Sequence, residues 1–461
     1  MDTKIDLRWL LLSKLVDFDN LNLHNLYKLS VIVLFLIFLL LALSPIIISR
    51  FRKSKFKSLL FSDTTFIFSL IAFTLASRWP CFLPPQLNAD ESQMIAGAMK
   101  LMKDPVFWRS VDGTTSGPLN YFPLLTSVLL GVRLEYASAR MVGLFLIIIS
   151  SICLFYSLRF IYGNVTARLS VIPIVTTISF MTYRDYVFYT SEHVSIAILS
   201  VSLLMLCKLY SSGLIFNKRL IFFLGFIIGL VPFAKLQAVP IALSVSLITI
   251  HILWIRRNSI AHFVNNFYVF LFGSVLFPIL TILNIIVFSL QDVFWRSYIR
   301  QNLLYSSGDS FNVLHYLLYF VFGSPDTKIF FALTVFFFLL SLLFLIYRFI
   351  SQPQNERLSD TSIFFLYSFT ILTASIFSVV KPGRFAPHYL LFLIFPAGFL
   401  IGVLIGELFK AYKYSKINLS KLKLSPLTLT IILIMIIIST LQLFMHVSQE
   451  NPYIEKHREF I

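Results

Sequence analysis

The chain has few charged residues. Only 13% of its 461 residues are Asp, Glu, Lys or Arg, whereas 58% are hydrophobic. A soluble domain has about 25% charged residues, so this composition cannot cover a water-exposed surface. Many apolar runs exceed the ~18 residues that mark a spanning helix, and they are continuous, unlike the alternating strands of a membrane barrel. We therefore predict an all-α, polytopic membrane protein.

Cysteine and the common catalytic motifs are also scarce. The three cysteines form no CxxC pair and no even-numbered disulfide framework. The chain contains no P-loop, no HExxH and no GxSxG segment, so it lacks these signatures of nucleotide, peptide and ester hydrolysis. The net charge of +17 does not indicate a nucleic-acid partner, because the Lys and Arg residues of a membrane protein collect in its cytoplasmic loops.

The positions of the basic residues give the predicted topology, since they mark the cytoplasmic ends of spans. The apolar segment 118–132 is short for a span. If it lies along the outer surface, every basic cluster falls on one side of the membrane; if it crosses, most do not. The topology then has about 12 transmembrane helices, with short membrane-lying helices in the first outer loop. The expected spans are 29–49, 60–78, 138–161, 169–186, 193–210, 220–234, 238–255, 263–289, 328–348, 361–379, 386–409 and 427–446.

Three parts follow from this topology. Residues 1–60 contain an amphipathic surface helix at Ile5–Val16 and an extra span. Residues 61–410 form the main membrane module, including an outer loop at 79–137. Residues 411–461 contain the final span and a short tail. The aromatic-rich loop 290–327 is expected to form part of an aromatic belt at the membrane surface.

Two adjacent pairs of ionisable residues, Asp90 with Glu91 and Glu192 with His193, are expected at the outer face. An ionisable residue within a membrane segment costs about 2.5–3.5 kcal/mol on insertion scales, so it is a functional candidate by default. Asp90 and Glu91 lie in the longest polar interval, 86–123, just before a short helix. They suit either the first turn of that helix or a general base for a hydroxyl group. Glu192 and His193 begin a later span, where Glu192 equally suits the first helical turn.

Cations are expected at the same face. Lys235 lies between two apolar stretches, in a Gly- and Pro-interrupted segment. Its long aliphatic side chain could extend so that the ammonium group reaches the membrane surface. Alternatively, the side chain could line a cavity at a break in the helix. Lys381, Arg384 and His388 surround a tight turn and a helix start. They could anchor the chain at the interface, but cations beside a helix N-terminus favour phosphate binding.

The order of these features resembles the GT-C superfamily of polyprenyl-phosphate-sugar-dependent glycosyltransferases. The nearest likeness is to the dolichyl-phosphate-mannose protein mannosyltransferase-like branch and to the bacterial lipid A aminoarabinose transferases. It covers most of the chain from Phe61 to Gly406. The segments that carry it are NADES at 88–92, GPLNY at 117–121, YTSEHV at 189–194, GFIIGLVPFAK at 225–235 and KPGRFAPHYLL at 381–391.

The resemblance implies that Asp90 is the catalytic base, supported by Glu91, and that Lys235 and Arg384 contact the lipid phosphate. Two positions depart from the family pattern. The family often has Lys where Gly117 stands, and the later acid is commonly Asp where Glu192 stands. The remaining residues of these segments that we expect to contact substrate are Glu192, His193, Lys381, His388, Tyr389 and Tyr121.

The predicted function is transfer of a sugar from a polyprenyl-phosphate donor to a hydroxyl of a lipid, glycan or protein acceptor. The active site would face the periplasm, exterior or lumen, and the membrane would be a bacterial inner membrane. No cofactor is required, although Glu91 and Glu192 could help to hold a divalent metal. A transporter or flippase of a lipid-linked or anionic substrate, and a glycan ligase or polymerase, are the alternatives.

Overall fold

The computed structural model describes residues 20–47, 62–213, 217–307, 315, 323, 326–351, 360–384, 386–414, 426–449 and 451–453. The expected surface helix at Ile5–Val16 lies outside these residues. The described part of the chain is helical throughout and has no β-strand. Ten of its helices are long and apolar enough to cross a membrane, which supports the prediction of a multi-pass membrane protein.

Each of the twelve expected spans coincides largely with a helix. The ten long ones are α2 (Asn20–Ile47), α4 (Asp63–Arg78, continued by η2, Trp79–Phe82), α7 (Tyr136–Tyr162), α9 (Glu192–Ser211), α11 (Val239–Ile255), α12 (Ile260–Val287), α16 (Lys328–Ser351), α17 (Asp360–Val380), α18 (Leu391–Tyr414) and α19 (Pro426–Ser448).

The other two expected spans are shorter than these ten when η2 is counted with α4 and η5 (Leu236–Ala238) with α11. Helices α8 (Asn164–Phe180) and α10 (Lys218–Ala234) have 17 residues each. Every α8 side chain from Thr166 onward is buried by neighbouring helices, so contact with lipid does not set its length. At a rise of about 1.5 Å per residue, either helix extends about 25 Å, at the lower limit for crossing a hydrocarbon core.

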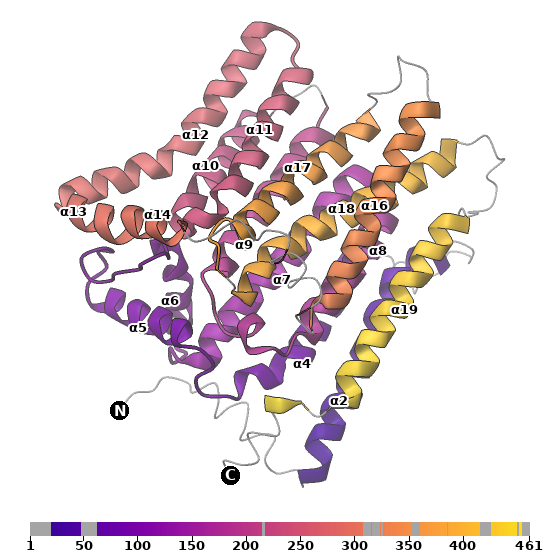
Figure 1. The fold of residues 1–461 in the computed structure, drawn as a ribbon, viewed down its shortest axis with the longest axis horizontal. Coiled ribbons are helices and arrows are strands. Elements are labelled where there is room, and N and C mark those ends of the chain that lie inside the picture. The colour runs from indigo at the N-terminus through magenta and orange to yellow at the C-terminus, as the bar shows by residue number, and fades with distance from the viewer. Residues whose placement is uncertain are drawn as a thin grey trace.

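Short helices gather at one end of the bundle. They are α5 (Ala89–Lys103), η3 (Pro118–Asn120), α6 (Phe122–Leu129), α13 (Gln291–Val293), the π-helix η6 (Phe294–Arg300) and α14 (Gln301–Tyr305) (Figure 1). Helix α6 has only eight residues, far fewer than a span needs. The segment 118–132 therefore does not cross as a helix.

Helix α10 is held close to α12 by glycine. A Cβ atom added at Gly225 would lie 2.2 Å from the Phe270 carbonyl oxygen, and one added at Gly229 would lie 2.3 Å from the Ser274 carbonyl oxygen. Small residues allow two helix backbones to approach closely in a membrane, where apolar burial alone does not drive helix association. This contact fixes the end of α10 from which the candidate site is built.

Candidate functional site

The site forms where the backbone between α10 and α11 is not helical. Lys235 has an extended conformation (φ −155°, ψ 124°) and is followed by the short helix η5 (Leu236–Ala238). The sequence predicted this break from the flanking proline and glycine residues. The Lys235 side chain is buried, with 5% of its surface exposed. It is therefore not directed to the membrane surface but lies inside the protein.

The break leaves backbone carbonyl groups without helical partners, and these groups accept hydrogen bonds from other segments of the chain. The Ala234 carbonyl accepts from the Gly117 N–H at 2.9 Å and from the Asn120 amide at 2.5 Å. The Pro232 carbonyl accepts from the Tyr298 hydroxyl at 2.5 Å. Irregular backbone is tolerated at membrane depth only when its polar groups are satisfied in this way. The η3 and η6 segments therefore complete the break and hold Lys235 in place.

Glycine at position 117 has a structural reason. A Cβ atom there would lie 2.0 Å from the Phe233 carbonyl oxygen, so no side chain fits without a backbone shift. The lysine that the resembling family often has at this position cannot occur in this arrangement.

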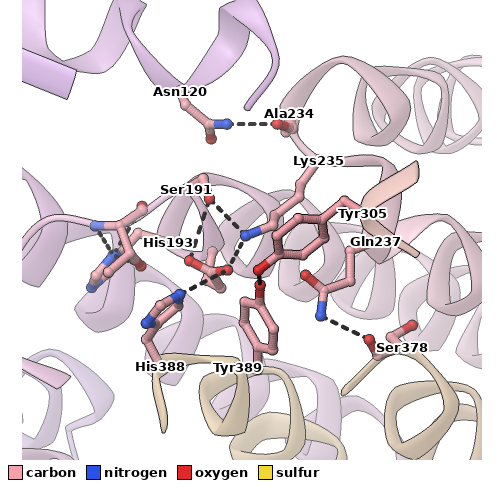
Figure 2. A network of polar contacts seen from close by, with 12 residues as sticks. Asn120, Ser191, His193, Ala234, Lys235, Gln237, Tyr305, Ser378, His388 and Tyr389 are labelled. Carbon is pink, nitrogen blue, oxygen red and sulfur yellow. Dashed lines mark hydrogen bonds and ion pairs between the residues drawn. The ribbon is translucent and has the colours of Figure 1, made fainter. Parts of the chain in front are cut away.

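Glu192 and Lys235 form the centre of the site (Figure 2). The Lys235 ammonium contacts Glu192 Oε1 and donates to Ser191 Oγ at 2.8 Å. His388 Nε2 lies 3.9 Å from the same Glu192 oxygen. The Glu192 side chain is fully buried. The first residue of α9 thus brings together groups from three separate parts of the sequence.

Two tyrosines and two further cations extend this centre. The Lys235 ammonium lies 5.0 Å from the centre of the Tyr389 ring, and the Tyr389 and Tyr305 hydroxyls are 2.5 Å apart. The Arg384 guanidinium lies over the Tyr305 ring at 4.5 Å. Lys381 is exposed and donates to the Ser306 carbonyl at 3.2 Å. Positive charge therefore surrounds a pair of hydrogen-bonded aromatic rings.

A cavity of about 170 Å³ opens beside this group. Lys235 and Lys381 supply its charge, Gln237 is held by the Ser378 carbonyl at 2.8 Å, and apolar side chains cover most of the remainder. Its lining residues on these apolar walls include Leu236, Pro240, Leu303, Phe377 and Pro382. A ligand with an anionic head and an apolar body would satisfy both parts of the lining.

An apolar crevice lies deeper in the same helices. On α9 it is lined by Ile196, Leu199 and Leu203, which lie four, seven and eleven residues after Glu192 and so follow the same helix face. Its other walls come from α11, α17 and α18, and include Ile241, Val245, Ile371, Leu391 and Phe395. Both the cavity and the crevice therefore border α11 and α17.

The adjacent acids Asp90 and Glu91 have different surroundings. Both Glu91 oxygens accept from the Arg140 guanidinium, at 2.8 and 2.7 Å, and both side chains are fully buried. Burial raises the pKa of the Glu91 carboxyl, against the effect of Arg140 and of the Tyr189 backbone N–H. Asp90 is exposed in the first turn of α5, which Asn88 caps.

Asp90 and Glu91 differ in how accessible their carboxylates are. Asp90 lies close enough to His388 and Tyr389 to interact with both electrostatically. Glu91 has its oxygens occupied by Arg140, so it positions the start of α5 rather than contacting a ligand. Of the two acids, Asp90 alone offers an accessible carboxylate.

His193 and Tyr121 lie away from the cavity. The His193 ring stacks on Tyr189 at 5.8 Å, and its Nδ1 bonds Thr190. Tyr121 is fully buried against Gly97 and the ring of Phe107. We expected both to bind substrate, whereas the structure places both side chains in packing contacts away from the cavity.

Sequence reasoning missed Arg140 and Tyr305. Arg140 lies near the start of α7, at the end that the predicted topology places on the outer face, so the criterion that selected Lys381 applies to it equally. Tyr305 carries no comparable signal, because it is one of many aromatic residues in the segment that we assigned to an aromatic belt.

The described residues contain no group of three or more His, Cys, Asp or Glu side chains placed to hold a metal ion. The carboxylates of Glu91 and Glu192 are each paired with a cation. Comparison with protein-family models, with curated proteins and with solved structures finds no match for this chain.

Proposed function

We propose that this protein is a GT-C-like membrane glycosyltransferase with about twelve spans that uses a polyprenyl-phosphate-linked sugar. The observation that carries the proposal is the cavity at Lys235, which combines two lysine side chains with a largely apolar lining. A separate apolar crevice borders the same helices α11 and α17. A phosphate on a long prenyl chain has the matching distribution of charge and apolar surface. The cavity and Asp90 would face the non-cytoplasmic side of the membrane.

In the proposed reaction, Asp90 removes the proton from an acceptor hydroxyl as its oxygen attacks the anomeric carbon of the donor. The bond between that carbon and the phosphate oxygen breaks, and the polyprenyl phosphate leaves with the bonding electrons. One displacement inverts the anomeric centre. Lys235 and Arg384 stabilise the negative charge that develops on the phosphate, a contribution of about 3–4 kcal/mol for one such donor in measured cases.

The separation of roles between Asp90 and Glu192 supports this assignment. Glu192 is buried against Lys235, so its carboxylate holds that side chain in place and is not open to an acceptor. Asp90 is exposed beside the same cluster and can accept one. The acceptor hydroxyl would enter from the side of α5, which lies at the open end of the bundle.

The decisive measurement is transfer of label from radiolabelled polyprenyl-phosphate sugars to a membrane extract by the purified protein. Asp90→Asn should lower the rate by about 10²–10⁴-fold, the usual range for loss of a general base, while donor binding persists. Asp112→Asn is the matched control, because Asp112 is also an exposed acid of the outer loop. Equal transfer by the parent and by Asp90→Asn would refute the role of Asp90.

A transporter or flippase of an anionic lipid is the second candidate, because a discontinuous helix at Lys235 is also typical of transport sites. It predicts movement of polyprenyl phosphate across a proteoliposome membrane without transfer of the sugar. A glycan ligase or polymerase would give label on a lengthening, lipid-linked product. The chemical state of the label therefore separates the transferase from the ligase or polymerase, and the proteoliposome measurement identifies a transporter.

A further inference from the structure

A second polar cavity lies at the same end of the bundle. It has a volume of about 160 Å³ and is enclosed by the ends of α8 and α19 and the start of α16. It shares no residue with the cavity at Lys235. One water molecule needs only roughly 10–15 Å³ on this measure, so the cavity has room for a solute.

Asp326 supplies a carboxylate to this cavity. Its Oδ2 accepts from the backbone N–H groups of Thr182 and Tyr183, at 2.8 and 2.5 Å. Its Oδ1 makes no hydrogen bond to the residues that the structure describes. The carboxylate is thus fixed in orientation by two donors and retains an oxygen for a ligand that donates a hydrogen bond.

Asn451 supplies a buried donor. Its Oδ1 accepts from the Tyr453 N–H at 3.0 Å, and only 5% of the residue is exposed. Its Nδ2 lies near the Tyr27 hydroxyl but has no partner at hydrogen-bond geometry in the described part of the chain. A buried, unused amide donor costs free energy unless a ligand or water accepts from it.

The remaining walls of the cavity are formed by aromatic rings and by amide side chains. The ring of His446 lies 4.9 Å from that of Phe180 and bonds the Tyr27 hydroxyl. Gln442 is bonded to the Thr176 and Thr177 hydroxyls, at 3.2 and 3.3 Å. Exposed Lys328 and Gln449 complete the opening.

These hydrogen-bond donors and acceptors favour one class of ligand. A fixed carboxylate disfavours a phosphate, and a single carboxylate is too few ligands for a hard divalent cation. A hydroxyl group both donates and accepts, so neighbouring hydroxyls can donate to Asp326 and accept from Asn451 or Gln449. We infer that this cavity is a binding site for a neutral, hydroxyl-rich ring, a sugar or a cyclitol.

The ring could arrive free or attached to a lipid. Helices α16 and α19 are only about one-third buried over their apolar windows, and Met445 in the cavity wall is itself exposed. A lipid that lies along the exposed side of α19 would therefore reach Met445 in the cavity wall, whereas a free ring would enter from solvent. The two sources share the same headgroup chemistry and differ in the route of entry.

Binding can be measured on the full-length protein without any assay of transfer. The free-sugar arm uses equilibrium dialysis of purified protein against tritiated methyl glucoside, methyl mannoside and inositol. The lipid arm uses nanodiscs of phosphatidylcholine with or without monoglucosyl diacylglycerol, read as protection of the protein against thermal unfolding. We expect saturable binding in at least one arm, and its identity assigns the source.

Asp326→Asn keeps an acceptor for the two backbone N–H groups but removes the charge, and should weaken binding by about tenfold or more. Gln449→Ala, at an exposed position, should weaken it severalfold without affecting folding. Gln301→Leu, an exposed amide elsewhere on the outer segment, is the matched control and should bind as the parent does. Absence of binding in both arms at millimolar ligand, or equal binding by the Asp326 and Gln449 variants and the parent, overturns the inference.

Discussion

Replacing Arg140 tests what holds residues 81–85 and the start of α5 in place. Its guanidinium donates to both Glu91 oxygens and to the carbonyl oxygens of Cys81, Pro84 and Pro85, at 2.6 to 3.0 Å. Replacing Arg140 by Met keeps an apolar stem of similar length but leaves Glu91 as a buried carboxylate without a cation. The loop 81–85 and the start of α5, which carries Asp90, lose their common anchor.

The magnitude follows from burial. Removing one partner of a buried, hydrogen-bonded ion pair costs about 3–5 kcal/mol. We take this cost as the free energy lost from the closed state of residues 81–85. Since every 1.4 kcal/mol changes an equilibrium constant tenfold, the population in which these residues are open rises by about a hundredfold to a few thousandfold. Cys81 reports the opening, because it is buried in the parent structure and lies in the released loop.

The assay is the rate of Cys81 labelling by a membrane-impermeant maleimide, in a protein whose Cys153 and Cys207 are replaced by alanine. Cys81 should be labelled faster in Arg140→Met than in the parent, by a factor that approaches the calculated rise in the open population. The double change with Glu91→Leu should label more slowly than Arg140→Met alone, because no buried charge is left unpaired.

Arg159→Met is the control, since Arg159 lies on the same helix α7 but is 42% exposed and pairs with Asp63. It should leave the labelling rate unchanged. A rate for Arg140→Met equal to that of the parent would refute the view that this residue anchors the loop.

Three further outcomes are expected. Gly117→Ala forces the new Cβ away from the Phe233 carbonyl and should destabilise the protein by about 1–3 kcal/mol, seen as a lower apparent Tm in detergent. Lys235→Met should reduce the yield of folded protein because Glu192 stays buried, and adding Glu192→Leu should restore the yield without restoring sugar transfer. Burial raises the pKa of Asp326, so its contribution to stability is present at low pH and is lost as pH rises through that pKa. Asp326→Asn should therefore gain apparent Tm relative to the parent between acid and neutral pH, and a gap independent of pH would contradict this.

Hydropathy and residue type determined much of the architecture. Long apolar runs must form helices in a bilayer, because only a helix or a closed barrel satisfies every backbone polar group there. The helical intervals and the short, non-crossing segment at 118–132 were predictable for that reason. The break at Lys235 was predictable as well, since Pro232 and Pro240 flank it and proline interrupts helical hydrogen bonding.

The partners of the polar residues were decided by tertiary structure alone. Glu91 meets Arg140 across 49 positions of the sequence, and Lys235 meets Glu192 across 43. Hydropathy shows that such groups are costly in a membrane, but it does not show which opposite charge neutralises each one. Packing of α5, α7, α9 and α10 made that choice. It left Glu91 as a structural anchor and Asp90 as an accessible acid, two neighbours that the sequence presents alike.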